Sequence, residues 1–285
     1  MISIGILAWN EEASIGATLH SLFEQSLLTQ SSESKIEVIV VANGCSDQTA
    51  DVARDTFAQQ KKSDWVSGSV LELSEPGKIN AWNCFIHEES SLDTDIFILL
   101  DADIKLLGES TLLNMVQVLR ENPDVLVATD EPIKHITQKE NLSPGEYVSL
   151  AISKMTKAAP GQLSGQLYAA RASALRRAVM PKGLIVEDGF LKQFLCTNGF
   201  TEPLNQNRIR RAPEAAHLFE AYLKVTDVLP NQKRQAMGHT IFTYLKDFLN
   251  QQADEGLSAE AVLRERSNSD PDWFRKEIQR RVHFG

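Results

Sequence analysis

The sequence predicts an α/β fold, in which a Rossmann-like, mostly parallel sheet is flanked by helices and followed by a helical C-terminal extension. Two patterns indicate this class. Short apolar runs alternate with amphipathic segments of helical period up to about residue 130, which is typical of a parallel sheet with crossover helices. From Pro213 to Gly285 the pattern is mostly helical. We therefore divide the chain into residues 1–130, 131–212 and 213–285.

The strands are expected where apolar runs lie between turn residues. In chain order they are residues 2–9, 35–42, 66–73, 96–100, 125–129 and 166–170. Helices are expected where apolar residues recur at helical spacing. They are residues 15–22, 46–59, 79–87, 110–120, 145–157 and 172–179, with a further helix opening at Val186. In such a sheet, ligands bind just outside the carboxyl ends of the strands.

The run Ile96–Leu100 is the strongest pointer to a function. Its five apolar residues indicate a buried strand, and Asp101 and Asp103 follow it with D-x-D spacing. Alternation puts both carboxylates on one face of the chain, at the binding edge of the sheet. Two such oxygen ligands suit Mg²⁺ or Mn²⁺. The other D-x-D pairs are interpreted as a solvated loop at Asp93–Asp95 and a helix start at Asp270–Asp272.

Composition limits the possible classes of protein. The 285 residues, 42% of them apolar, suffice for one large domain with a full core, which excludes a disordered chain. The net charge of −9 argues against nucleic acid as a partner. The first residues are interpreted as a strand and not a signal peptide, and no apolar run is long enough for a transmembrane helix. Together with three cysteines that fit reduced thiols, this predicts a cytoplasmic protein.

Six short motifs follow one another over roughly residues 1–240. They are Ala8-Trp9-Asn10-Glu11, Val40 to Thr49, Gly77 to Asn83, Asp101-Ala102-Asp103, Val186-Glu187-Asp188 and Arg234 to Gly238. In this order and spacing they resemble the signature of the inverting family 2 glycosyltransferases of GT-A fold. The resemblance implies a GT-A fold and a hexosyltransferase type of activity. A sugar would pass from a nucleotide diphosphate sugar to an acceptor hydroxyl, with Mg²⁺ or Mn²⁺ as cofactor.

The resemblance also implies the role of particular residues. Asp188 would be the catalytic base on the acceptor hydroxyl. Asp101 and Asp103 would hold the metal, with His217 as a candidate third ligand. The nucleotide site would be formed by Ala8, Trp9, Asn10, Glu11, Asn43, Gly44, Lys78, Asp101, Ala102 and Arg234. Residues 1–130 would be the nucleotide-sugar half of the domain, 131–212 the acceptor half, and 213–285 a helical extension.

Several of these residues also have an ordinary structural interpretation. Lys78 would add a point charge at the diphosphate, but it also fits a solvated turn. Glu11 and Asn43 would hydrogen-bond the nucleoside, but such residues also serve as helix caps and in turns. Asp188 fits the acidic first turn that a helix dipole favours. A structural or surface role competes with metal ligation for His217.

Two departures from the family pattern bear on specificity. Ala42 stands where the family usually has an aspartate that contacts the base, so a uridine donor cannot be assumed. Gln235 replaces a tryptophan near the acceptor side, which leaves the acceptor open between a carbohydrate, a lipid-linked molecule and a small molecule. Peripheral docking to a membrane and the oligomeric state also stay open.

Other functions compete with this interpretation. A haloacid-dehalogenase-like phosphatase also places D-x-D after an apolar strand, but near its N-terminus and with Thr-Leu following. A sugar nucleotidyltransferase needs a glycine-rich, basic first loop, which Leu7 to Glu11 does not supply. A degenerate nucleotide-sugar-binding module without catalysis is favoured by Ala42, whereas the presence of Asp101, Asp103 and Asp188 argues against it.

Overall fold

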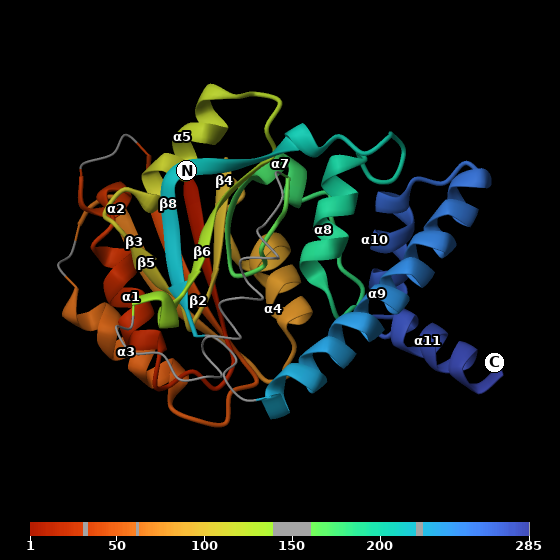
Figure 1. Cartoon of the computed structure of the whole chain (residues 1–285), viewed down its shortest axis with the longest axis horizontal. Coiled ribbons are helices and arrows are strands. Elements are labelled where there is room, and N and C mark those ends of the chain that lie inside the picture. Colours follow the sequence, from red (N-terminus) through yellow and green to blue (C-terminus); the bar gives the residue numbers. More distant parts are fainter. Residues whose placement is uncertain (31–33, 61–62, 139–160, 221–224, 285) are drawn as a thin grey trace.

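One mixed sheet forms the centre of the molecule (Figure 1). The computed structural model describes residues 1–30, 34–60, 63–138, 161–220 and 225–284. Within these ranges the strands are β1 (Ile2–Ala8), β2 (Ile36–Asn43), β3 (Val66–Leu73), β4 (Ile96–Asp101), β5 (Lys105–Leu107), β6 (Val127–Lys134), β7 (Leu167–Arg171) and β8 (Ile209–Phe219). Their order in the sheet is β3-β2-β1-β4-β7-β6-β8-β5.

The first four strands in this order are parallel, as the alternating pattern predicts. Ala8 at the end of β1 pairs with Ala42 of β2, and Leu7 pairs with Asp101 of β4. The carboxyl ends of these strands therefore meet at one edge. In the other half, β7 runs antiparallel to β4 and β6, whereas β8 is parallel to β6 and antiparallel to β5.

The two faces of the sheet are covered by different helices (Figure 1). Alternation along β4 sends Ile98 into a core with α1 (Ile15–Phe23) and α5 (Thr111–Glu121), and Phe97 into a core with α4 (Lys78–Cys84) and α8 (Glu187–Cys196). The remaining elements before the C-terminal helices are α2 (Ser26–Thr29), α3 (Thr49–Gln59), α7 (Ala172–Leu175), a π-helical turn (Phe85–Glu89) and 3-10 turns at His135–Gln138 and Gln206–Arg208.

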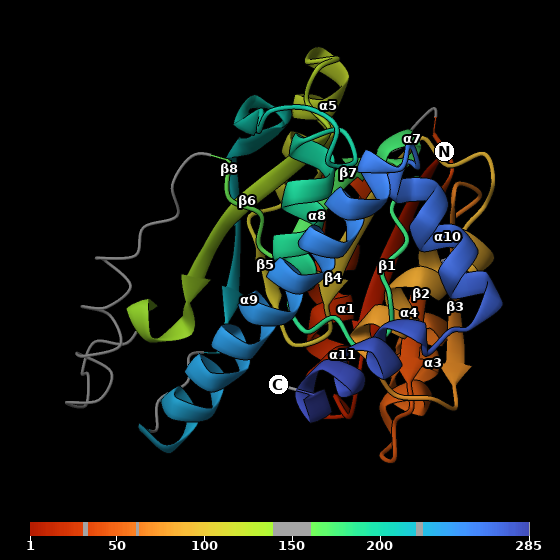
Figure 2. The ribbon, with the colours of Figure 1, turned by 90° about the vertical axis from the view of Figure 1, so that its right-hand side faces the viewer.

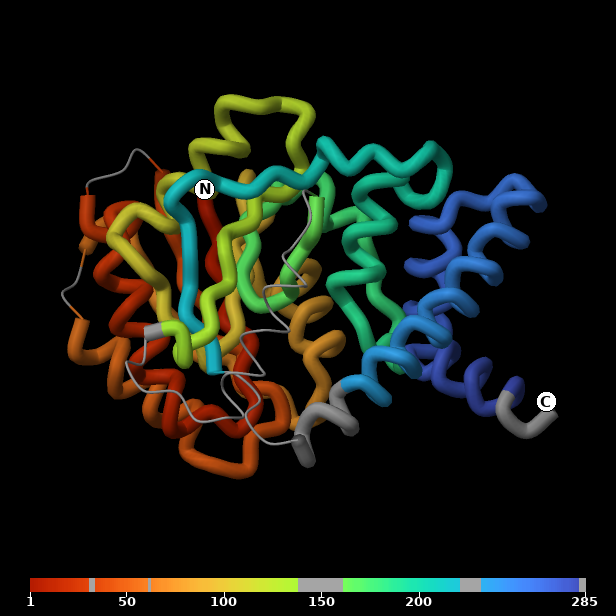
Figure 3. The backbone as a smooth tube through the Cα atoms, viewed as in Figure 1, coloured from red at the N-terminus to blue at the C-terminus, as the bar shows by residue number. Residues whose placement is uncertain are grey.

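Three helices close the chain: α9 (Val225–Asp254), α10 (Ala259–Ser269) and α11 (Trp273–Phe284). They lie beyond α8, on the side away from the sheet, and extend away from it (Figures 1, 2 and 3). Leu245, Val262 and Phe274 are buried in the same core as α4 and α8. The extension therefore shares its apolar core with one face of the sheet. None of the helices in the described ranges is long and apolar enough to span a membrane.

The structure corrects the expected secondary structure in the second half. Residues 213–219, expected to be helical, belong to β8. The pairing of β8 with β6 jumps from Arg211 to Ala216, so Pro213 falls in an irregularity where no ladder hydrogen bond is needed. The helix expected over 172–179 ends at Leu175, and the last helix begins at Trp273 rather than at Pro271 after an N-cap at Asp270. The helix expected at 145–157 lies outside the described residues.

Candidate active site

A cavity of about 420 Å³ lies at the carboxyl edge of the parallel strands. It is lined by Leu7, Trp9, Glu11, Asn43, Pro76, Gly77, Lys78, Asp101, Ala102 and Asp103. These residues come from the ends of β1, β2 and β4, and from the loop before α4. Seven of the ten are residues that the sequence assigned to the nucleotide or metal site. They came from four separate motifs, and the fold brings them to one place.

The loop after β1 is held by the loop after β2. Asn10, which has a positive φ of 56°, accepts a hydrogen bond at Oδ1 from the Ser46 backbone N–H over 2.8 Å. The Glu11 backbone N–H donates to Thr49 Oγ1 at 2.7 Å. The side chain of Asn10 therefore links the loop after β1 to the loop after β2. Trp9 remains 58% exposed at the cavity, where its indole presents a large apolar surface.

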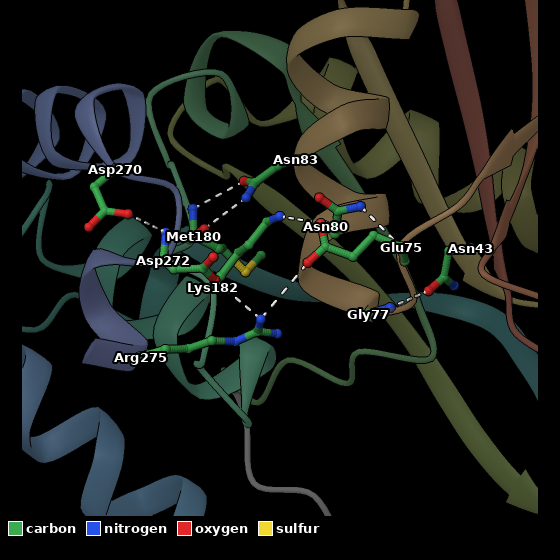
Figure 4. A network of polar contacts seen from close by, with 10 residues as sticks. All are labelled: Asn43, Glu75, Gly77, Asn80, Asn83, Met180, Lys182, Asp270, Asp272 and Arg275. Atoms are coloured by element: carbon green, nitrogen blue, oxygen red, sulfur yellow. Dashed lines mark hydrogen bonds and ion pairs between the residues drawn. The ribbon is translucent and has the colours of Figure 1, made fainter. Parts of the chain in front are cut away.

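Asn43 and Gly44 join the end of β2 to two neighbouring segments. The Asn43 amide nitrogen donates to the Ala8 carbonyl at 2.8 Å, and its oxygen accepts from the Gly77 N–H at 2.6 Å (Figure 4). Gly44 has a φ of +66°, and a Cβ there would lie 2.6 Å from the Pro76 nitrogen. The Asn43 amide, predicted from the sequence to contact the nucleoside, thus holds the walls of the cavity together.

The turn that carries the D-x-D pair is fixed from α1. The buried Thr18 hydroxyl lies 2.7 Å from the Ala102 carbonyl and 2.8 Å from the Ile104 carbonyl. Asp103 is exposed in the cavity, and Asp101 lies at the last position of β4. Thr18 was not singled out from the sequence. Its only local signal is a polar residue on the apolar face of an amphipathic helix.

Lys78, at the start of α4, forms the centre of the charged part of the site. Its ammonium lies 2.7 Å from Asp101 Oδ1, 2.9 Å from Glu187 Oε1 and 3.2 Å from the Gly165 carbonyl. Burial alone would lower the pKa of Lys78, but the two carboxylates raise it well above its usual value. Lys78 therefore carries a positive charge. From the sequence, Glu187 was noted only as the neighbour of Asp188. In the structure its carboxylate pairs with Lys78.

Among the described residues, carboxylates outnumber the Lys78 ammonium around the cavity. They belong to Glu11, Asp101, Asp103, Glu187 and Asp188. Burial raises the pKa of Asp101 to about 6 although Lys78 opposes it, and burial also raises the pKa of Glu11. In the described ranges, no three His, Cys, Asp or Glu side chains converge in a metal-binding cluster. Asp101 and Asp103 still fit Mg²⁺ or Mn²⁺, because these ions are usually held by one or two carboxylates together with substrate phosphates.

Asp188 lies in the first turn of α8, immediately after Glu187. Its Oδ1 accepts the Gly189 N–H at 2.7 Å, and its Cβ lies 3.7 Å from where a Cβ on Gly165 would be. Burial, and then the Glu187 carboxylate, raise the pKa of Asp188. The preceding Val186 packs on α9, because a Cβ on Gly238 would lie only 2.1 Å from Val186 Cγ2. The Gly238 motif thus supports the start of α8.

A surface network holds the loop before Lys78 from outside (Figure 4). Glu75 pairs with Lys182 at 2.6 Å, and Arg275 of α11 lies 3.9 Å from the same carboxylate. Asn83 of α4 exchanges two hydrogen bonds with the backbone of Met180, at 2.7 and 3.1 Å. The segment leading to Asp188 and the C-terminal helix are therefore both connected to the loop that lines the cavity.

The sequence model of glycosyl transferase family 2 matches residues 3–180. The chain belongs to this family. It is therefore a glycosyltransferase, and the cavity at the carboxyl edge is its candidate active site. A comparison with curated protein sequences finds no significant match.

Solved structures with the same fold include other glycosyltransferases. The mannosyltransferase PcManGT from Pyrobaculum calidifontis, in complex with GDP-Man and Mn²⁺, has a TM-score of 0.61 and 17% identity, over 100% of this chain and 80% of that one. TarS of S. aureus has a TM-score of 0.53 and 17% identity, over 77% and 60% of the two chains. Glucosyl-3-phosphoglycerate synthase from Mycobacterium tuberculosis, in complex with Mg²⁺ and UDP, has a TM-score of 0.50 and 19% identity, over 80% of this chain and 74% of that one. At these identities the likeness shows the GT-A fold alone.

Two residues assigned from the family resemblance lie away from the glycosyltransferase cavity. His217 is fully buried within the sheet, and its Nδ1 lies 2.6 Å from Asp130 Oδ2. Because its ring is engaged with Asp130 and does not line the cavity, it does not join Asp101 and Asp103 as a third ligand in this structure. Arg234 is exposed on α9 and likewise does not line the cavity.

Proposed function

We propose that this glycosyltransferase inverts the anomeric carbon and uses Mg²⁺ or Mn²⁺ to transfer a sugar from a nucleotide diphosphate sugar to an acceptor hydroxyl. The observation that carries the proposal is the meeting of two motifs at Lys78. The ammonium pairs with Asp101 of the D-x-D turn and with Glu187, the residue before Asp188. The carboxylate pair proposed to hold the metal and the candidate base therefore lie close together. The GDP-Man and UDP complexes of proteins with this fold support the donor class.

In this proposal each part of the site has one chemical task. Asp101 and Asp103 would hold the cation, and that cation would supply Lewis-acid stabilisation of the departing diphosphate, worth roughly several kcal/mol. Trp9 and Glu11 line the cavity and would form the wall beside the nucleoside. Asp188 would take the proton of the acceptor hydroxyl as the acceptor oxygen bonds to the anomeric carbon. The bond from that carbon to the phosphate oxygen breaks, and its electron pair leaves with the diphosphate.

The identity of the donor's nucleobase is a separate question, because Ala42 offers no carboxylate to contact it. Ala42 is buried, with 2% exposure, and pairs with Ala8 on one side and Glu72 on the other. We propose that base choice in this protein is relaxed or altered. Among UDP, GDP, ADP and dTDP, a preference for UDP of about 10⁴-fold or more, typical of a fully hydrogen-bonded site, would contradict this.

Calorimetric titration of these four nucleotides, with and without Mn²⁺, tests the proposed function. We expect binding of at least one nucleotide to depend on Mn²⁺ and the Asp103→Ala variant to lose that dependence. The Asp93→Ala variant is a matched control, because Asp93 belongs to another D-x-D pair and is exposed outside the cavity. A ligand at a hundredfold excess over Kd should also stabilise the fold by about 2.7 kcal/mol in thermal unfolding. Metal-linked binding that survives in Asp103→Ala would contradict the proposal.

A further inference from the structure

The hydrogen-bonding capacity of Lys78 is fully used. An ammonium has three N–H donors, and three oxygens lie within 3.2 Å of Lys78 Nζ. They belong to the end of β4, the first turn of α8 and the segment before β7: Asp101, Glu187 and Gly165. Lys78 therefore has no donor left for a diphosphate while it keeps all three partners. If the diphosphate is bound here, one of these contacts must be exchanged.

Asp101 is the partner that would be given up. Its carboxylate is shared between Lys78 and the site proposed for the cation, so ligation by Asp101 weakens its pairing with the lysine. Glu187 and the Gly165 carbonyl would then still hold the ammonium. The freed donor would lie on the Asp101 side of Lys78, which is the side that lines the cavity.

The surroundings of Glu187 are shaped for this contact. Its side chain is 16% exposed, and its Oε1 lies 2.9 Å from where a Cβ on Gly165 would be. Any larger residue at position 165 would push the carboxylate away from Lys78. A glutamate that served only the helix dipole would need neither a cation partner nor this space.

We propose that Glu187 is a positioning residue that keeps Lys78 at the diphosphate end of the cavity, so that a bound donor also fixes the start of α8 and the neighbouring Asp188. The proposal rests on the proposed function, because it assumes a nucleotide diphosphate donor. It assigns Glu187 an effect on donor binding that a helix-dipole residue would not have. The effect must pass through Lys78.

A double-mutant cycle on nucleotide binding tests this route. Mn²⁺-dependent binding of the preferred nucleoside diphosphate is measured by calorimetry for wild type, Glu187→Gln, Lys78→Met and the double variant. We expect Glu187→Gln to weaken binding by roughly 10-fold to 100-fold, as is usual for residues that support a ligand-contacting group. In the Lys78→Met background the same substitution should change affinity little. Glu202→Gln is the matched control, because Glu202 pairs with Arg208 at 2.8 Å and does not line the cavity.

A second variant tests the same contact without removing a charge. Gly165→Ala should displace the Glu187 carboxylate and weaken binding in the same direction as Glu187→Gln, again only when Lys78 is present. Unchanged affinity in both Glu187→Gln and Gly165→Ala would overturn the positioning role and leave the proposed function standing. Losses that add fully in the double variant would overturn it as well. Absence of metal-dependent nucleotide binding in the wild type would instead overturn the proposed function.

Discussion

The two sides of the candidate active site are built in different ways. On the donor side, Asp101 is the last residue of β4 and Asn43 is the last residue of β2. The parallel sheet itself therefore sets their positions. On the base side, Glu187 and Asp188 lie in the first turn of helix α8 and not at the end of a strand. Their position depends on contacts with distant segments, among them Lys78 and Gly238. The donor side is therefore set by the fold class, whereas the base side is set by tertiary packing and should be easier to perturb.

The largest expected effect separates the two sides chemically. Asp188→Asn keeps the shape of the side chain but removes the proton acceptor. We expect kcat to fall by roughly 10²–10⁴-fold, the usual contribution of a general base. Nucleotide and Mn²⁺ affinity should stay close to wild type, because Asp101 and Asp103 are unchanged. Steady-state kinetics together with calorimetry measure both quantities.

Two other outcomes would change this view of Asp188. Normal turnover with slightly earlier melting would show that Asp188 only stabilises the first turn of α8, where a carboxylate contributes about 0.3–1 kcal/mol of unfolding free energy through the helix dipole. A large loss of nucleotide affinity would show that the two sides are not separable, and Asp188 would then belong to the donor site.

The second prediction asks whether His217 belongs to the metal site or to the sheet. His217→Ala leaves Asp130 buried without its partner, and Asp130 Oδ1 already has no hydrogen bond. We expect the free energy of unfolding to fall by roughly 3–5 kcal/mol, as when one member of a buried pair is removed. The Mn²⁺ dependence of nucleotide binding should persist. His20→Ala, at an exposed position of α1, is the control for denaturant unfolding.

A folded, stable His217→Ala protein that has lost Mn²⁺-dependent binding would reverse this assignment. His217 would then be a metal ligand in the bound state, and Asp130 would be the residue that orients it.

The same division explains what could be predicted from the sequence. Strands β1 to β4 were located within one or two residues, because apolar, β-branched runs end in turn residues there. Strand β8 was missed, since Pro213 and several alanines hide a strand whose pairing is interrupted. The D-x-D pair could be placed because Asp101 ends the apolar strand β4 and Asp103 lies in the turn directly after it. The contact between Lys78 and Glu187 joins residues far apart in the chain and has no local signature.

Packing of α9 against the base side gives the third prediction. A methyl group at position 238 would collide with Val186, so Gly238→Ala must move Val186 and α9 apart, and we expect the start of α8 to shift with Val186. We expect a loss of about 1–3 kcal/mol of unfolding free energy, which is typical of overpacking, and a lower kcat at unchanged nucleotide affinity. Gly16→Ala is the matched control in α1, where the nearest atom is 3.6 Å away. It should be neutral or stabilising by about 0.4–1 kcal/mol.

An unchanged kcat in Gly238→Ala, with the expected loss of stability, would mean that Val186 moves without moving Asp188. The base side would then be as rigid as the donor side, and the contrast between them would disappear.

The smallest expected effect is a displacement of the acid limb of the pH–rate profile. Burial, followed by the Glu187 carboxylate, raises the pKa of Asp188, and Lys78 lowers it. A base must be ionised, so kcat should fall as pH drops through this raised pKa, at a higher pH than for an ordinary aspartate. Glu187→Gln removes the like charge and should move the acid limb to lower pH. Lys78→Met removes the opposing cation and should move it to higher pH.

With donor, acceptor and Mn²⁺ saturating, kcat reports the complex and not the affinity changes that these substitutions also cause. Opposite shifts in the two variants, with none in Glu202→Gln, place the titrating group beside both charges, as Asp188 is. Asp101 faces the same two charges, so the limb is assigned to Asp188 only if the residual activity of Asp188→Asn no longer shows it. Shifts of the same sign would assign the limb to another group.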